Sequence, residues 1–156
     1  MKKYSILLTL ALFAFVSLST AQTKTDDQPT VTQSIEVDSL HNLSVAWQYF
    51  KSKKAYQSSL MRTDETLVAN PAFSKIDEVL YIAGMSCYYL LNNKGKQKLN
   101  FALMSDAEKE RFSSDRLRED AYVYLGMLIE DHADSKYAKK AKKYFDELDK
   151  SRKKSD

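Results

Sequence analysis

The chain has 156 residues and a formal net charge of +3, with three glycines and two prolines. So few glycines and prolines favour helices over the short, turn-rich strands of a sandwich or barrel. The near balance of 24 basic and 21 acidic residues gives no general electrostatic case for a nucleic-acid partner. The only cysteine, Cys87, lies in the apolar stretch "YIAGMSCYYLL", which indicates a buried, unreactive thiol and excludes an internal disulfide framework.

Residues 1–21 have the pattern of a cleavable secretory signal peptide. A basic "MKK" precedes an apolar run from Ile6 to Val16, and Ser19 and Ala21 supply the small residues of a cleavage site. The run is shorter than the roughly 20 apolar residues that a membrane-spanning helix needs. We therefore expect export, a periplasmic location and no membrane contact except through partners; a retained anchor is the alternative.

The next stretch, residues 22–37, is polar, contains Pro29 and has no helical stripe, so we expect a disordered linker. A single helical domain is expected over 38–152, followed by a basic tail at 153–156. Apolar residues recur at three- and four-residue spacings, as one face of a helix requires. The expected helices span 38–52, 55–70, 74–92, 114–132 and 134–151, with a polar join at 51–54 and an inserted loop at 93–113.

Three helix starts are expected from side-chain caps. Asp38 is the expected N-cap of the first helix, Ser74 with Asp77 resembles a capping box, and Ser105 with Glu108 opens a short helix in the loop. The residues expected to face inward are Leu40, Leu43, Trp47, Phe50, Tyr56, Leu60, Thr63, Leu67, Ile76, Val79, Leu80, Ala83, Cys87, Leu90, Leu117, Ala121, Tyr124, Leu125, Leu128, Tyr137, Ala141, Tyr144, Phe145 and Leu148. Gly84 lies on this face, so Gly84→Leu is expected to overpack a helix interface at a cost of about 1–3 kcal/mol.

Two stretches, "NPAFSKIDEVLYIAG" and "DHADSKYAKKAKKYF", repeat one pattern 62 residues apart. Each has a short polar turn, a serine and then an apolar stripe of helical period. Each would close one helix hairpin and open the next helix, which is typical of a helical array. One hairpin cannot bury its own apolar stripe, so stacking a second against it would build a shared core.

These junctions resemble those of tetratricopeptide repeats, over roughly residues 40–150. The resemblance is closest to the group that contains BamD, of the outer-membrane β-barrel assembly machinery, and the TolA-binding periplasmic coordinator. Their register, "P-x-S-x-x-x-x-E-A-x-Y-x-x-G", is matched by Pro71, Glu78, Leu80, Tyr81 and Gly84, and in the second copy by Asp134, Ser135, Tyr137 and Ala141. The resemblance implies antiparallel helix hairpins, about two repeats plus a C-terminal helix.

The chain departs from that family in three ways. Ala133 stands in place of the junction proline, and no cysteine follows the signal to accept a lipid. A repeat of about 34 residues also leaves roughly 28 extra residues between the two junctions, most of them in the loop at 93–113.

The sequence contains no catalytic or metal-binding pattern that we would assign. His41 and His132 fall at expected helix ends without cysteine or carboxylate at ligand spacing. Phosphate-loop, serine-hydrolase and zinc-protease motifs are absent from the printed sequence. We therefore expect a non-catalytic binding protein without a cofactor or metal.

Two groups of residues are candidate protein-binding surfaces. Asp77, Tyr81, Met85 and Tyr88 would lie on the side of their helix away from the inward stripe, where they could hold a peptide. The alternative is that the tyrosines pack on a neighbouring hairpin. In the loop, Phe101, Leu103 and Met104 are expected to tuck into the core, with an exposed apolar lip as the alternative.

The resemblance implies an envelope adaptor that assists outer-membrane β-barrel assembly through protein contacts. A periplasmic coordinator of the TolA-binding type and an accessory binding module for a cell-wall enzyme remain as alternatives.

Overall fold

The computed structural model describes residues 30–153, and all regular structure in that range is helical. The prediction of an all-α fold is therefore confirmed. The long helices are α2 (Val31–Trp47), α3 (Tyr56–Ala69), α4 (Ile76–Leu91), α6 (Ser114–Asp131) and α7 (Ala138–Arg152); the short ones are η1 (Gln48–Lys53), η2 (Phe101–Leu103) and α5 (Asp106–Arg111). The expected signal peptide, residues 22–29 of the linker and residues 154–156 of the tail lie outside the described residues.

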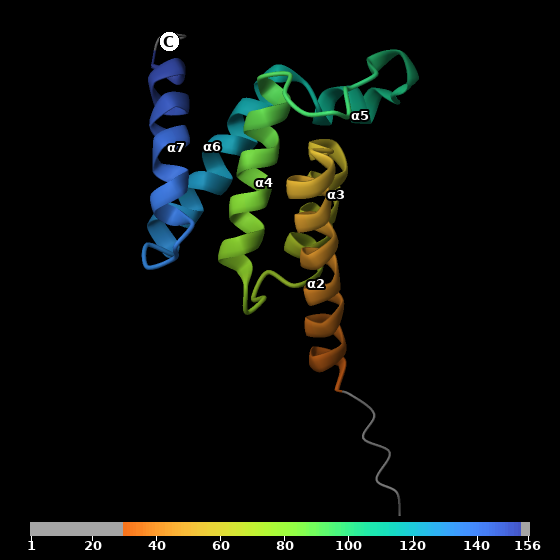
Figure 1. The fold of residues 1–156 in the computed structure, drawn as a ribbon, viewed down its shortest axis with the longest axis vertical. Helices are drawn as coiled ribbons and strands as arrows, with labels where there is room; N and C mark the ends of the chain where they lie inside the picture. The colour runs from red at the N-terminus through yellow and green to blue at the C-terminus, as the bar shows by residue number, and fades with distance from the viewer. Residues whose placement is uncertain (1–29, 154–156) are drawn as a thin grey trace, which may run out of the picture.

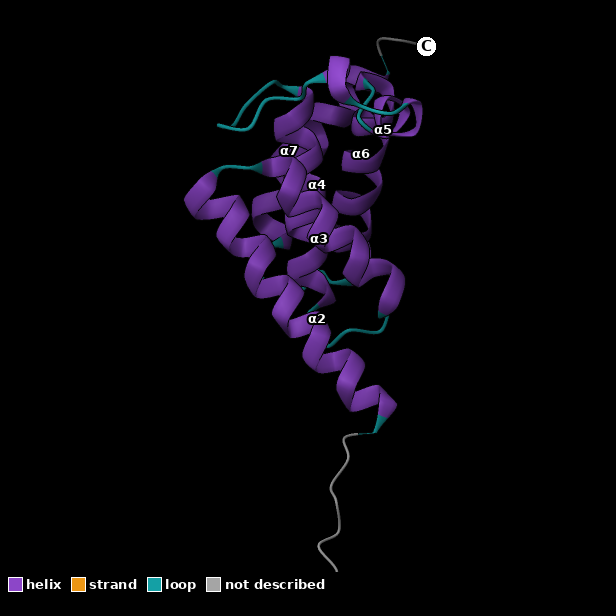
Figure 2. Ribbon diagram, turned by 90° about the vertical axis from the view of Figure 1, so that its right-hand side faces the viewer, coloured by secondary structure: helices purple, strands orange, loops and turns teal. Residues whose placement is uncertain are grey.

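Helix α4 is the centre of the molecule. Figure 1 shows it between α6 and α7 on one side and α2 and α3 on the other. The chain turns back after each long helix, so α2 with α3, and α4 with α6, form antiparallel hairpins, and α7 packs against α6 and α4. The view turned by 90° shows α2 along one edge of the molecule and α6 toward the other (Figure 2).

Because neighbours surround α4, it is buried almost all round. Every residue from Ile82 to Cys87 is buried, and the two apolar clusters of the core meet on this helix. A helix buried on all sides is apolar on all sides, which agrees with the sequence "YIAGMSCYYLL". None of the helices within residues 30–153 is both long enough and apolar enough to cross a bilayer.

The segment 93–113, which was expected to be an inserted loop, contacts both hairpins. Gly95 has φ +102, a conformation that other residues rarely adopt, and a Cβ there would lie 2.7 Å from the carbonyl oxygen of Lys54. Arg111, at the end of α5, donates to Asp64 of α3 at 2.7 Å and to Asp120 of α6 at 2.6 Å. The predicted cap of α5 is confirmed, since Ser105 and Glu108 form a capping box.

Three expectations about helix ends and one about burial were wrong. Residues 31–37 are helical, because Thr30 caps α2 through a capping box with Gln33; Asp38 lies inside the helix. Ser74 does not cap α4, whose N-cap is Lys75 without a side-chain bond. Leu40, expected inside, is 39% exposed. The expected join at 51–54 is largely the last turn of η1, a π-helix.

Candidate functional site: an aromatic face with a lysine-rimmed slot

One face of the molecule is lined by aromatic side chains from three parts of the chain that are far apart in the sequence: α2 with η1, α4, and α7 with its N-cap. We call this set the aromatic face; it comprises Trp47, Phe50, Tyr81, Tyr88, Tyr89, Tyr137 and Tyr144. Ring pairs link α2 and η1 to α4, and α4 to α7. The rings of Trp47 and Tyr137, which are 90 positions apart, have centroids 5.7 Å apart. Such aromatic pairs contribute about 0.5–1.5 kcal/mol beyond the burial of their area.

The Glu78 carboxylate joins the three helices that carry this face. Its Oε2 accepts a hydrogen bond from Trp47 Nε1 at 2.7 Å and another from the Tyr137 hydroxyl at 3.1 Å. Burial raises the pKa of Tyr137 to about 12, with a further contribution from the Glu78 carboxylate. Glu78 thereby fixes the relative positions of α2, α4 and the start of α7.

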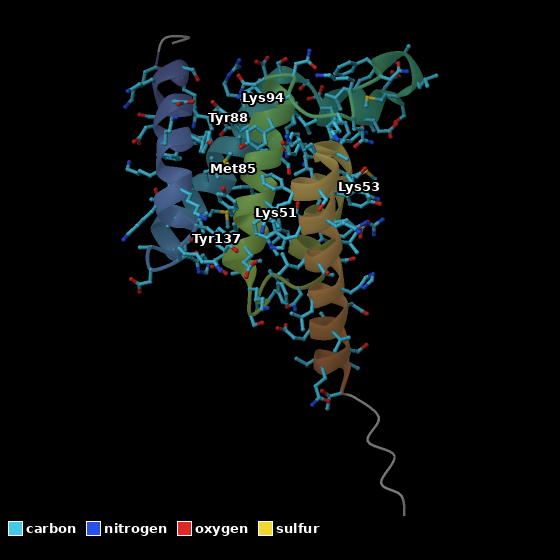
Figure 3. All side chains as sticks on the ribbon, in the orientation of Figure 1. Lys51, Lys53, Met85, Tyr88, Lys94 and Tyr137 are labelled. Carbon is cyan, nitrogen blue, oxygen red and sulfur yellow. The ribbon has the colours of Figure 1, made fainter. Side chains whose placement is uncertain are left out.

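A slot of about 370 Å³ opens on the aromatic face. Its lining residues are Trp47, Phe50, Lys51, Tyr81, Lys136, Tyr137 and Lys140, and we refer to them as the slot. Figure 3 shows Lys51 and Tyr137 on either side of α4. The rings supply an apolar floor and the three lysines form the rim.

The π-helix η1 places two of the slot residues. It carries Phe50 and Lys51, and the Lys51 ammonium lies 3.8 Å from the centroid of the Trp47 ring. The chain leaves η1 through Lys54 in the left-handed conformation, with φ 50. π-Helical turns are rare and occur frequently at functional sites, so this turn supports a functional interpretation of the slot.

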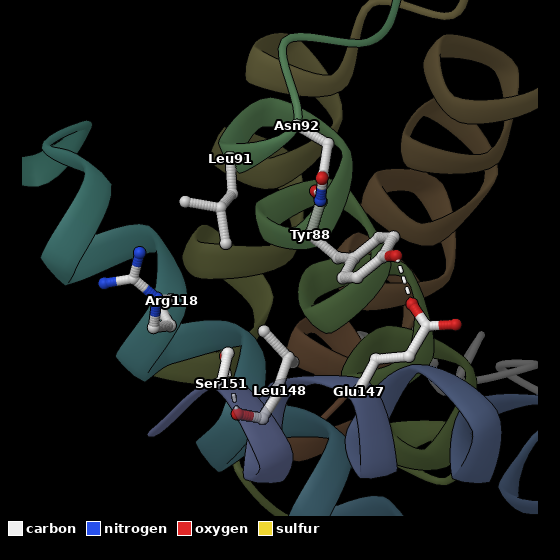
Figure 4. Close-up of a pocket in the computed structure, with 7 residues that line it drawn as sticks. All are labelled: Tyr88, Leu91, Asn92, Arg118, Glu147, Leu148 and Ser151. Carbon is white, nitrogen blue, oxygen red and sulfur yellow. Dashed lines mark hydrogen bonds between the residues drawn. The ribbon is translucent and has the colours of Figure 1, made fainter. Parts of the chain in front are cut away.

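A second pocket, of about 380 Å³, lies between the ends of α4 and α7 (Figure 4). Within it Tyr88 donates a hydrogen bond to Glu147 at 2.5 Å, and Arg118, which also lines it, pairs at 2.9 Å with the exposed Asp115 outside the pocket. Burial, followed by the hydrogen bond to Glu147, raises the pKa of Tyr88 to about 12. Because these polar groups already have partners within the protein, this pocket offers less to a ligand than the slot does.

The structure separates the predicted binding residues. Met85 is fully buried, so its place on a binding face was wrong; α7 and the turn before it cover the side of α4 that was expected to be open. Tyr81 stacks on Tyr137 with centroids 4.9 Å apart, and Tyr88 meets Tyr144 at the same distance. Both tyrosines therefore pack on a neighbouring helix, as the alternative interpretation expected.

Asp77 also bonds within the fold, since it accepts a hydrogen bond from Ser135 Oγ at 2.6 Å. Of the three loop residues that were expected to tuck into the core, only Met104 packs against it. Phe101 and Leu103 are 45% and 83% exposed, so the expectation that they tuck into the core was wrong. They form an exposed apolar lip.

The expectation of an inert thiol agrees with the structure. Cys87 is fully buried, and this burial raises the pKa of its thiol well above the usual range. No group of three or more metal-binding side chains occurs in the part of the chain that the structure describes.

Comparison with protein-family models, curated proteins and solved structures finds no significant match to the chain. The site is therefore interpreted from its own geometry.

The slot was not predicted from the sequence. Trp47, Phe50 and Tyr137 were expected to face inward and do pack in or against the core, but no role was given to the lysines. One signal was present: Trp47 and Lys51 are four positions apart, the spacing at which side chains meet on a helix.

Proposed function

We propose that this protein is a non-catalytic adaptor that holds a segment of a partner protein against its aromatic face. The slot carries this proposal, because it combines half-buried aromatic rings with charged groups in one concave site. Few convergent polar groups on a mostly apolar floor are typical of binding pockets. Tyrosine and tryptophan are also the residues that most often dominate protein–protein binding energy.

The carboxylates beside the slot support binding over catalysis. Glu78 and Asp77 accept hydrogen bonds from neighbouring helices and loops, and so hold the site in shape. A general acid or base would need a proton to exchange with substrate, whereas these oxygens face donors of the protein itself. Their geometry suits a preformed recognition surface.

We further propose that the partner is an envelope protein, and that the adaptor assists outer-membrane β-barrel assembly in the manner of BamD. Two features of the sequence support this role: the signal-like residues 1–21, and the junction register shared with that tetratricopeptide group. The order of helices, two antiparallel hairpins and a final helix, is compatible with such an array. The adaptor would reach the membrane through its partner.

The test is in-cell crosslinking of the tagged full chain, followed by mass spectrometry of the envelope fraction. The slot variant is Lys51→Glu with Lys140→Glu; the matched control is Lys139→Glu with Lys150→Glu, which changes charge equally at exposed positions outside the slot. We expect components of the β-barrel assembly machinery with the wild type and the control, and their loss with the slot variant. Recovery of only Tol-system or cell-wall proteins would overturn the assembly role. Equal recovery with all three chains would overturn the role of the slot.

A further inference from the structure

The three lysines of the slot have charge that the described residues do not neutralise. Lys51 lies over Trp47 at 3.8 Å, and Lys136 and Lys140 lie over Tyr137 at 4.9 and 5.7 Å from the ring centroid. Over residues 30–153, none of the three forms an ion pair. A cation–π contact orients an ammonium group but leaves its N–H donors able to bind an anion.

The nearby carboxylates form no ion pair with these lysines in the described part of the chain. The hydrogen bonds that Glu78 and Asp77 accept there come instead from neutral donors: Trp47 and Tyr137 for Glu78, and Ser135 for Asp77. By contrast, Lys142 forms an ion pair at 2.7 Å with Asp146, four positions further along the same helix. The lysines at the rim of the slot are thus oriented by aromatic rings and remain available to an external anion.

Because the floor of the slot is aromatic, a ligand that fills it needs an apolar group in addition to an anionic one. Phe50, Trp47 and Tyr81 are half-buried, and they present ring surface inside the rim. The volume of about 370 Å³ is near the lower end of the roughly 300–1,000 Å³ of ligand pockets. It suits one large side chain with its neighbours and is too small for a folded domain.

We propose that the slot binds an acidic, extended segment of a partner protein, with one aromatic or large aliphatic side chain flanked by aspartate or glutamate. This inference rests on the proposed function and specifies the chemistry of its partner. The apolar side chain lies on the ring floor, and the flanking carboxylates bind the ammonium groups of the rim.

The aromatic face also gives the direction and spacing of the segment. Beyond the slot, Lys94 lies 5.9 Å from the Tyr88 ring centroid, and Lys143 lies 5.9 Å from that of Tyr144. Figure 3 shows Lys94 near Tyr88 at the upper end of α4. Tyr81 and Tyr88 are seven residues apart, which is about 10 Å along a helix. Since an extended chain rises about 3.3 Å per residue, a second acidic group is expected about three residues from the first.

The test uses Trp47 as the reporter, because it is the only tryptophan in the chain. The probe is a capped dodecapeptide with one central phenylalanine, glutamates beside it and three residues further on, and glycine and serine elsewhere. Two control peptides replace every glutamate with lysine, or the phenylalanine with alanine. The full mature chain is titrated at low and at high salt.

We expect a saturable change in Trp47 emission with the acidic peptide, at least tenfold weaker binding of either control peptide, and weakening by salt. Lys51→Glu with Lys140→Glu should lower the affinity at least tenfold, and Lys139→Glu with Lys150→Glu should leave it within twofold. Circular dichroism checks that both variants are folded.

Several results would overturn the inference. They are the absence of a saturable change up to millimolar peptide, equal binding of the acidic and basic peptides, and an equal loss in both double variants. Stronger competition by a polyanionic glycan than by the peptide would also overturn it and assign the slot to glycans. If a partner crosslinks through the slot in cells but the basic peptide displaces it, the acidic chemistry fails while the proposed function stands. If no partner crosslinks there, the proposed function itself fails.

Discussion

The close approach of α4 and α6 at Gly84 can be tested by adding a single carbon atom. A Cβ at this position would lie 2.6 Å from Leu125 Cδ2, 2.7 Å from its Cγ and 3.3 Å from its backbone nitrogen. Leu125 is fully buried, so its side chain cannot move into solvent. The third contact is with backbone, which requires α6 itself to shift.

The magnitude of Gly84→Ala follows from two opposing effects. Overpacking a core costs about 1–3 kcal/mol. Alanine in place of glycine inside a helix stabilises the folded state by about 1 kcal/mol. Because two contacts fall below 3.0 Å and one involves backbone, we expect overpacking near the top of its range and a net loss of about 1–2 kcal/mol. For Gly84→Leu, the same contacts put the expected loss at about 3 kcal/mol, the upper end of the range expected from the sequence.

The assay is urea unfolding followed by circular dichroism, with Gly126→Ala as the matched control. Gly126 lies in α6, and a Cβ there would meet the edge of the half-buried Phe145 ring at 3.2 Å. That ring can shift, so Gly126→Ala should be neutral or stabilising by up to about 1 kcal/mol. If Gly84→Ala proves as stable as the wild type, or matches Gly126→Ala, the close packing of α4 on α6 is refuted.

Three further predictions concern the insertion and the aromatic face. Arg111→Met leaves two carboxylates without their shared cation; because the side chain is one-quarter exposed, we expect a loss of about 2–3 kcal/mol in urea unfolding, and faster proteolysis within 93–113. Glu78→Ala removes the acceptor of the Trp47 indole and should cost about 1–3 kcal/mol and shift Trp47 emission. Tyr88 and Tyr137 should ionise near pH 12 in an absorbance titration at 295 nm, above the usual 10.0. Since the folded state holds these protons more tightly, their contribution to stability is complete below pH 10 and is lost as the pH rises from 10 to 12.

The chain supplies a control variant for each of the two substitutions. Arg118→Met breaks a pair with the exposed Asp115 and should change stability by less than about 0.5 kcal/mol. Glu65→Ala breaks an exposed pair with Arg62 and should leave Trp47 emission unchanged. Losses equal to those of Arg111→Met or Glu78→Ala would contradict the reasoning. So would titration of every tyrosine near pH 10 while the circular dichroism stays native.

Helical periodicity was sufficient to predict the long helices, because each of them buries a stripe of apolar residues. It failed for residues 31–37, whose apolar residues Val31, Ile35 and Val37 form no buried stripe. Their helix depends on the Thr30–Gln33 capping box and on Asn70, which donates to Glu36 at 3.0 Å. The second of these contacts joins segments 34 positions apart, so no local pattern contains it.

The binding face was harder to predict because it depends on how α4 is surrounded. A single stripe was assumed for α4, and Met85 was placed opposite it; four neighbouring helices instead leave little of α4 open. The slot is formed by residues near 50, 81 and 137, whose meeting depends on the tertiary fold. The tyrosines of the repeated junctions were identified, while their pairing across helices and the lysines around them were not.

The central claim, that a partner binds along the aromatic face, is tested most directly by site-specific photo-crosslinking in cells. A photoreactive residue replaces Lys143, beside Tyr144 on the aromatic face, or Val68, which is 85% exposed on α3 and outside the slot. We predict that position 143 crosslinks to a component of the β-barrel assembly machinery and that position 68 does not. Crosslinks to that partner from position 68 alone, or no crosslink from position 143, would contradict the account.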